Sequence, residues 1–157
     1  MNTSAKIFSL PELMQRLAFW RTLGDTIVFT NGCFDILHPG HVHLLQTCRS
    51  FGDRVIVGLN ADVSVKRLKG EKRPVNNEQS RAIILAALSA TDAIILFEED
   101  TPEQLIHHIK PDVLVKGGDW KKEEIVGNSF VQSYGGKTEV VPYLSGHSTT
   151  SIIERSK

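Results

Sequence analysis

Cysteine is scarce in this sequence of 157 residues, which contains only Cys33 and Cys48. The two thiols lack the close pairing of a zinc site, and they are too few to form a disulfide framework. We therefore expect both to stay reduced, as thiols do in a reducing compartment, and to behave as small, partly buried side chains.

Neither sign of charge predominates, because 18 lysines and arginines balance 18 aspartates and glutamates. A formal net charge of zero creates no global field that would attract nucleic acid or an anionic membrane. Long hydrophobic runs are missing too: none approaches the roughly 20 residues of a membrane-spanning helix, and no signal-peptide core follows the polar N-terminus. These absences predict a cytoplasmic protein that binds neither nucleic acid nor a membrane.

The sequence does contain a regular alternation of short apolar runs with helical patterns. Continuous apolar strands are typical of a sheet that is covered on both faces. The pattern predicts a three-layer α/β/α fold with a five-stranded, mostly parallel sheet. Ligands of such sheets bind beyond the carboxyl ends of the strands, so a site is expected in the loops that follow them. We expect strands at residues 26–30, 54–59, 93–97, 112–116 and 138–141, and helices at 10–22, 41–51, 77–89, 101–109, 122–134 and 148–155.

The loop after the first strand reads T-N-G-C-F-D-I-L-H-P-G-H and ends at His41. Gly32 lets the backbone turn sharply, and Gly40 leaves room where a ligand must approach closely. His38 and His41 lie three residues apart at the start of a helix, so they can face the same side. A helix N-terminus favours a phosphate, and imidazole groups there can donate hydrogen bonds to it.

A zinc site is the alternative for this pair of histidines. It would need a third and a fourth ligand, which only the distant His107, His108 and His147 could supply. The strand before the motif and the helix after it favour the phosphate-binding interpretation.

The pattern G-x-F-D-x-x-H-x-G-H resembles the signature of the cytidylyltransferase-like nucleotidyltransferases, a Rossmann-like family that transfers a nucleotidyl group to phosphorylated substrates. The resemblance implies that His38 and His41 stabilise the pentacovalent α-phosphate and the leaving pyrophosphate. For Asp35 a structural role is expected before a catalytic one. The nucleotide-binding residues expected in this loop are Thr30, Asn31, Gly32, Cys33, Phe34, Gly40 and His41.

Residues 66–73 hold five cations and one acid. Such a run is often a solvated loop and sometimes a nucleic-acid patch, but here it follows the second strand and can overhang the same end of the sheet as a flexible flap. The resemblance implies a catalytic lysine that bridges the phosphates, and Lys66 and Lys69 are both candidates. It also matches Arg81 to a nucleotide-binding arginine, for which a surface helix residue is the alternative.

Two later segments follow the same family pattern. The run K-G-G-D-W after the fourth strand would form a wall for base and ribose, or simply a tight turn with a packed tryptophan. The run S-T-T would bind the outer phosphates at the start of the last helix, or its serine would simply cap that helix. The residues implied are Gly117, Asp119, Trp120, Ser148, Thr149 and Thr150.

Several phrases together resemble one subfamily, the heptose 1-phosphate adenylyltransferases of lipopolysaccharide-core precursor synthesis: T-N-G-C-F-D-I-L-H-P-G-H, L-K-G-E-K-R-P-V, F-E-E-D-T-P, V-K-G-G-D-W and S-T-T-S-I-I. This resemblance implies that ATP and a sugar 1-phosphate react to give ADP-heptose and pyrophosphate. Mg²⁺ would be carried with ATP and would keep most of its waters, so few protein ligands are expected. Many relatives are fused behind a sugar kinase, and here we expect a separate kinase.

The resemblance predicts a single nucleotidyltransferase domain over residues 1–157, with a leading helix at 10–22 and a catalytic core at 26–155. Glycerol-3-phosphate cytidylyltransferases are a related alternative, but their R-T-E-G-I-S-T-T ending has Tyr143 here in place of its arginine. A cofactor-forming nucleotidyltransferase would need a longer apolar pocket. A nucleotide-binding module without turnover is the alternative of another class, and the joint presence of all the motifs argues against it. The leading helix could also pack against a second copy in a homo-oligomer.

Overall fold

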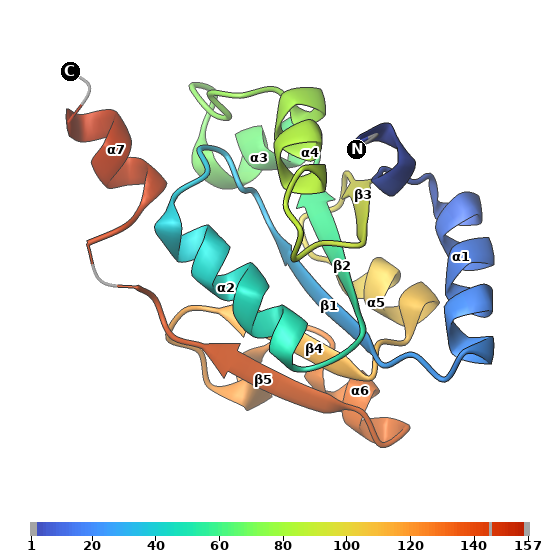
Figure 1. The fold of residues 1–157 in the computed structure, drawn as a ribbon. Coiled ribbons are helices and arrows are strands. Elements are labelled where there is room, and N and C mark those ends of the chain that lie inside the picture. Colours follow the sequence, from blue (N-terminus) through green and yellow to red (C-terminus); the bar gives the residue numbers. More distant parts are fainter. Residues whose placement is uncertain (1–2, 145, 156–157) are drawn as a thin grey trace.

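The computed structural model describes residues 3–144 and 146–155, which are arranged around one sheet (Figure 1). Five strands pair in the order β3-β2-β1-β4-β5, and every pair of neighbours is parallel. The predicted Rossmann-like α/β fold is therefore confirmed, with a sheet that is parallel throughout. The strands are β1 Ile27–Gly32, β2 Arg54–Asn60, β3 Ala93–Phe97, β4 Val113–Gly117 and β5 Lys137–Val141.

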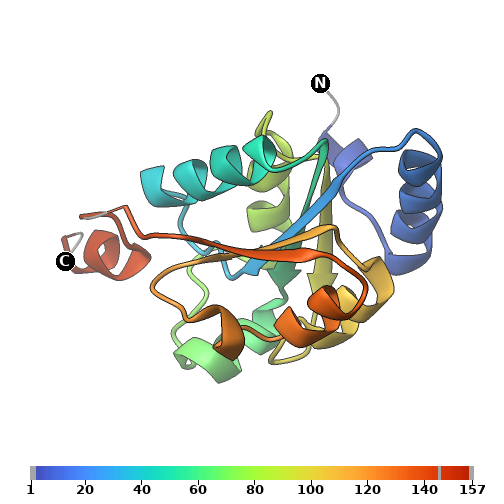
Figure 2. The same cartoon turned by 90° about the horizontal axis from the view of Figure 1, so that it is seen from below.

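Helices cover both faces of the sheet (Figures 1 and 2). One buried cluster joins the sheet to α1, α5 and α6, and includes Leu17, Ile106 and Val131. The other joins the opposite face to α2 and α4, and includes Leu45 and Leu85. The helices are α1 Leu10–Thr22, α2 Pro39–Ser50, α3 Asp62–Lys69, α4 Glu78–Ala86, α5 Glu103–Ile109, α6 Asn128–Ser133 and α7 Thr149–Arg155, with 3-10 turns η1 Thr3–Lys6 and η2 Lys122–Glu124.

The order of the strands reverses between β1 and β4, and such a switch point predicts a crevice there. The chain runs outward from β1 through β2 to β3, and it then returns to the other side of β1 for β4 and β5. The loops after β1 and β4 therefore diverge at the carboxyl edge of the sheet, which is where open parallel sheets bind their ligands. The motifs that begin at Thr30 and at Lys116 both lie at this edge.

Two local predictions are wrong. The first half of the flexible flap expected at 66–73 is instead the end of the helix α3. The buried side of α3, Ser64 and Val65, is too narrow to show as a helical pattern among so many charges. The single helix expected at 122–134 is broken into η2 and α6. Gly127 between them has φ of +89°, and a side chain there would lie 2.7 Å from Ile106, so the chain turns sharply at this point.

The last helix, α7, stands off from the body of the fold beside the N-terminal end of α2 (Figures 1 and 2). None of its described residues is buried. Among the described residues, no helix combines the length and the apolar character that a membrane span requires.

Candidate functional site

The two histidines of the first loop lie face to face at the N-terminus of α2. His38 is the N-cap residue in extended conformation, and Pro39 opens the helix. The rings of His38 and His41 stack with centroids 3.7 Å apart and planes 24° apart. The Nδ1 atoms of both rings are buried and have no hydrogen-bond partner within the described chain. The prediction that both imidazoles face the same side is confirmed.

Burial keeps both imidazoles neutral near pH 7. It lowers the pKa of His41 to about 4, and the neighbouring charge of His38 acts in the same direction. The pKa of His38 is also lowered, first by burial and then by the charge of His147. A neutral imidazole can donate one hydrogen bond without bringing a charge, and a bound phosphate would favour the protonated form.

Two glycines allow this packing. A side chain at Gly40 would lie 3.0 Å from the ring of His38, and one at Gly32 would lie 3.1 Å from the ring of Phe34. The Phe34 ring packs against His41, with centroids 4.9 Å apart. Phe34 itself has φ of +43°, which is an uncommon backbone conformation for a bulky residue and marks a loop held under strain.

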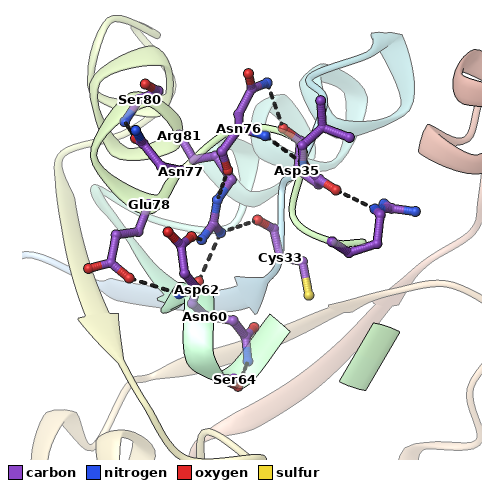
Figure 3. Close-up of polar contacts among 12 residues, drawn as sticks. Cys33, Asp35, Asn60, Asp62, Ser64, Asn76, Asn77, Glu78, Ser80 and Arg81 are labelled. Atoms are coloured by element: carbon purple, nitrogen blue, oxygen red, sulfur yellow. Dashed lines mark hydrogen bonds and ion pairs between the residues drawn. The ribbon is translucent and has the colours of Figure 1, made fainter. Parts of the chain in front are cut away.

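Asp35 anchors the far end of the basic segment to this loop (Figure 3). Its buried carboxylate accepts hydrogen bonds from Arg73 Nε at 2.5 Å and from the backbone N–H groups of Val75 at 2.8 Å and Asn76 at 3.2 Å. The Asn76 side chain returns a bond to the Asp35 carbonyl at 3.0 Å. These contacts give Asp35 the structural role that its place in the motif predicted.

Arg81 joins the same network from α4 (Figure 3). Its side chain is fully buried, so the alternative of a surface helix residue is wrong. The guanidinium donates to the carbonyls of Asn76 at 3.0 Å, Cys33 at 2.6 Å and Asn60 at 2.8 Å, and it pairs with Asp62 at 2.8 Å. Arg81 therefore ties the ends of β1 and β2 to the start of α3 and to the segment before α4.

The two candidate lysines lie on the last turn of α3 and are exposed. Burial raises the pKa of the Cys33 thiol, and the positive charges of Lys69 and Arg81 lower it to a smaller extent. Lys69 therefore lies near the end of β1. Between the two lysines, Arg67 is held by Asp100 at 2.8 Å and by the carbonyl of Glu98, which fixes this turn of the helix.

The loop after β4 forms a second wall of the crevice. Gly117 packs closely against Leu44 of α2, and Gly118 has φ of +123°. Asp119 and Trp120 are exposed. The indole of Trp120 lies beneath the ammonium of Lys116, which is 5.4 Å from the ring centroid. A solvent-facing indole beside two glycines is able to stack on a base.

The segment S-T-T lies beside the histidine loop. Ser148 Oγ accepts a hydrogen bond from the N–H of Ser151 at 3.1 Å, as an N-cap does. Thr149 Oγ1 donates to the carbonyl of Ile36 at 3.4 Å, and Thr150 is exposed. The start of α7 therefore reaches the loop that carries the histidines, although Thr149 and Ile36 lie 113 positions apart in the sequence.

Thr30 differs from the other predicted residues because its side chain is fully buried beneath the loop, whereas Asn31 and Cys33 are partly exposed.

Three residues near the crevice were missed as site residues. His147 and Arg73 reach it only through long-range folding. Lys116 belongs to the K-G-G-D-W motif, and a cation at the end of a central strand is a signal that could have identified it.

The sequence matches the family described as Cytidylyltransferase-like over residues 29–155. This chain belongs to that family. The cytidylyltransferase-like match covers both histidines, α3 and the S-T-T segment.

Curated relatives within this range are named bifunctional protein HldE. The protein from Hyphomonas neptunium is 52% identical over 98% of this chain, and that from Rhodopseudomonas palustris strain BisB18 is 56% identical over 93% of it. The matched segments make up 32% and 30% of those proteins, so this chain spans about a third of their length.

Two solved structures have a similar fold. The lipopolysaccharide core biosynthesis protein from Thermoplasma volcanium is 30% identical, with a TM-score of 0.67 over 78% of this chain and 100% of that one. The pantoate-beta-alanine ligase from Francisella tularensis has a TM-score of 0.61 over 94% of this chain and 75% of its own, but at 18% identity it shows the fold alone.

Proposed function

We propose that this chain is an adenylyltransferase that transfers AMP from ATP to heptose 1-phosphate, giving ADP-heptose and pyrophosphate. The observation that carries the reaction class is the stacked, neutral pair His38 and His41 at a helix N-terminus in the sheet crevice. The sequence phrases shared with heptose 1-phosphate adenylyltransferases support the sugar. A solved relative named for lipopolysaccharide core biosynthesis agrees with it.

The sugar phosphate needs no general base, because its oxygens are already ionised near neutral pH. It would attack the α-phosphate of ATP directly and expel pyrophosphate in line, without a covalent enzyme intermediate. Charge builds on the phosphate oxygens as the new bond forms. His38 and His41 would donate hydrogen bonds to those oxygens, and the N–H groups of the first turn of α2 would add to them.

The other residues would hold the nucleotide in place. We assign the bridging role to Lys69 rather than Lys66, because Lys69 is the one whose charge reaches Cys33 at the end of β1. Trp120 would stack on the adenine and Gly117 and Asp119 would border it. Thr149 and Thr150 would bind the outer phosphates at the start of α7. Arg81 would act indirectly, by holding the loop that contacts the triphosphate.

We propose that Mg²⁺ arrives already bound to the nucleotide. The described residues contain no group of three or more histidine, cysteine, aspartate or glutamate side chains that could hold an ion. Mg²⁺ carried on ATP would neutralise part of the triphosphate charge, with phosphate oxygens and water as most of its ligands. The protein then needs to supply only cations and hydrogen-bond donors, which Lys69 and the two histidines provide.

The relatives also bear on the supply of substrate. Each is named bifunctional, and about two thirds of each lies outside the segment that matches this chain. We propose that this chain performs the nucleotidyl-transfer half of such a pair and that a sugar kinase supplies its substrate.

Pyrophosphate release tests the proposal. Purified protein with Mg²⁺ is given ATP or CTP, each with heptose 1-phosphate or glycerol 3-phosphate, and His41→Ala is assayed in parallel. We expect release with ATP and heptose 1-phosphate, and its loss in the variant. Release only with CTP and glycerol 3-phosphate would overturn the substrate. Nucleotide binding without release for any pair would overturn the reaction.

A further inference from the structure

Lys116 lies on the side of the sheet opposite the two histidines. Side chains alternate along β4: Val113 and Val115 pack in the cluster that contains α2, and Leu114 packs in the cluster on the other face. Lys116 lies two residues after Leu114, so its side chain leaves the same face of the sheet as that of Leu114. Its register partner on β5, Val140, also packs against the face away from α2.

In the part of the chain that the structure describes, no carboxylate pairs with the Lys116 ammonium. The ammonium lies over the Trp120 ring, and the Cys33 thiol and Lys69 are near enough to influence its pKa. Burial lowers the pKa of Lys116; the Cys33 thiol raises it and the like charge of Lys69 lowers it, both to a smaller extent. Lys69 and Lys116 are close enough for their like charges to interact, and an anion bound by both would relieve that repulsion.

The geometry of the proposed reaction indicates which anion would bind to the two lysines. In an in-line displacement the attacking oxygen and the leaving oxygen lie on opposite sides of the α-phosphate. The histidines and the start of α7 lie at the N-terminal end of α2, so the triphosphate and its leaving pyrophosphate belong on that face. The attacking phosphate must then come from the other face, which is where Lys116 points.

We propose that Lys116, together with Lys69, binds the phosphate of the sugar 1-phosphate acceptor. This inference rests on the proposed function. In the transfer, the acceptor's phosphate oxygen forms a bond to the α-phosphorus while the bond from that phosphorus to the bridging oxygen of pyrophosphate breaks. Lys116 contributes charge and a hydrogen bond that fix the attacking group, and it exchanges no proton.

Steady-state kinetics of Lys116→Met test this assignment, because methionine keeps an apolar stem on Trp120 and removes only the charge. We expect the KM for the sugar 1-phosphate to rise about 10- to 100-fold, as for loss of one charge-assisted hydrogen bond, while the KM for ATP changes less than about twofold. Lys116→Arg should recover much of the loss. Lys116→Gln is made in parallel in case Lys116→Met does not fold, and thermal unfolding checks each variant.

Lys137→Met is the matched control, since this exposed lysine lies at the opposite, amino-terminal end of β5 and should leave both KM values unchanged. A rise in the KM for ATP with an unchanged KM for the acceptor would overturn the inference. So would unchanged kinetics in both folded variants, which would leave Lys116 as a lysine packed on Trp120.

The outcome for wild-type protein separates this inference from the proposed function. If it uses a different phosphorylated acceptor, the proposed sugar is overturned, and a raised KM for that acceptor in Lys116→Met would still support the inference. If it turns over no acceptor at all, both are overturned.

Discussion

The rings of His38 and His41 stack 3.7 Å apart although neither has a hydrogen-bond partner for its buried Nδ1 within the described chain. Two unpaired polar atoms in a buried position are unfavourable unless a ligand or water satisfies them. The Phe34 ring packs against His41, and the absence of a side chain at Gly40 leaves room for the His38 ring. The pair is best understood as a preorganised set of donors.

Replacing His41 tests that interpretation by activity. We expect His41→Gln to lower kcat about 100- to 1,000-fold, because it removes a donor that strengthens as charge develops on the α-phosphate. His43→Gln is the matched control: His43 is exposed on the same helix, and its replacement should leave kcat unchanged. A loss of activity in both variants, or in neither, would contradict the assignment.

The buried imidazole also predicts a dependence of stability on pH. Since the folded pKa of His41 is lowered to about 4 from the ordinary value near 6.5, folding favours the neutral form. The lowered pKa contributes about 3 kcal/mol to the free energy of unfolding. This contribution is fully present above about pH 6.5 and is lost as the pH falls towards 4. Urea unfolding of wild type and His41→Gln from pH 7 to pH 4 measures it. The variant should show a clearly shallower decline, and parallel declines would count against a buried neutral His41.

Asp35 and Arg73 make a prediction about folding. The Asp35 side chain is only 2% exposed, so Asp35→Asn leaves Arg73 without its partner in a mostly buried place. We expect a loss of about 3 kcal/mol in the free energy of unfolding. Asp100→Asn breaks the exposed pair with Arg67 and should cost less than about 1 kcal/mol. Equal effects of the two changes on the urea midpoint would show that the Asp35 network has no special weight.

Arg81 distinguishes a structural role from direct nucleotide binding. Lysine cannot reach the four acceptors that the guanidinium contacts, so Arg81→Lys should lower the free energy of unfolding by about 3 kcal/mol. Activity that remains in the folded fraction should show a modest rise in the KM for ATP. A fully stable variant with a greatly raised KM for ATP would instead place Arg81 on the nucleotide.

Much of the fold could be predicted because its signals are local. The leading helix was expected at 10–22 and is observed at Leu10–Thr22, since Pro11 and the periodic leucines coincide with a capping box between Ser9 and Glu12. The strand at 93–97 was also predicted with its observed bounds. Helix α3 escaped prediction because burial of only Ser64 and Val65 holds it to the sheet.

The candidate site, too, could be predicted from the sequence only in part. The facing of His38 and His41 follows from their spacing on one helix turn, and the sequence is enough to predict it. The contact of Asp35 with Arg73 and the approach of Lys69 to Lys116 join residues far apart along the chain. Only the strand order, which places β1 between β2 and β4, brings those groups together.

The most direct test of the central claim is a competition. Wild-type protein and Mg²⁺ are mixed with equal concentrations of ATP, CTP, heptose 1-phosphate and glycerol 3-phosphate, and the nucleotide products are identified by mass spectrometry at early times. We expect ADP-heptose as the main product and pyrophosphate in equal amount. CDP-glycerol as the main product, or no new nucleotide product at all, would contradict the claim.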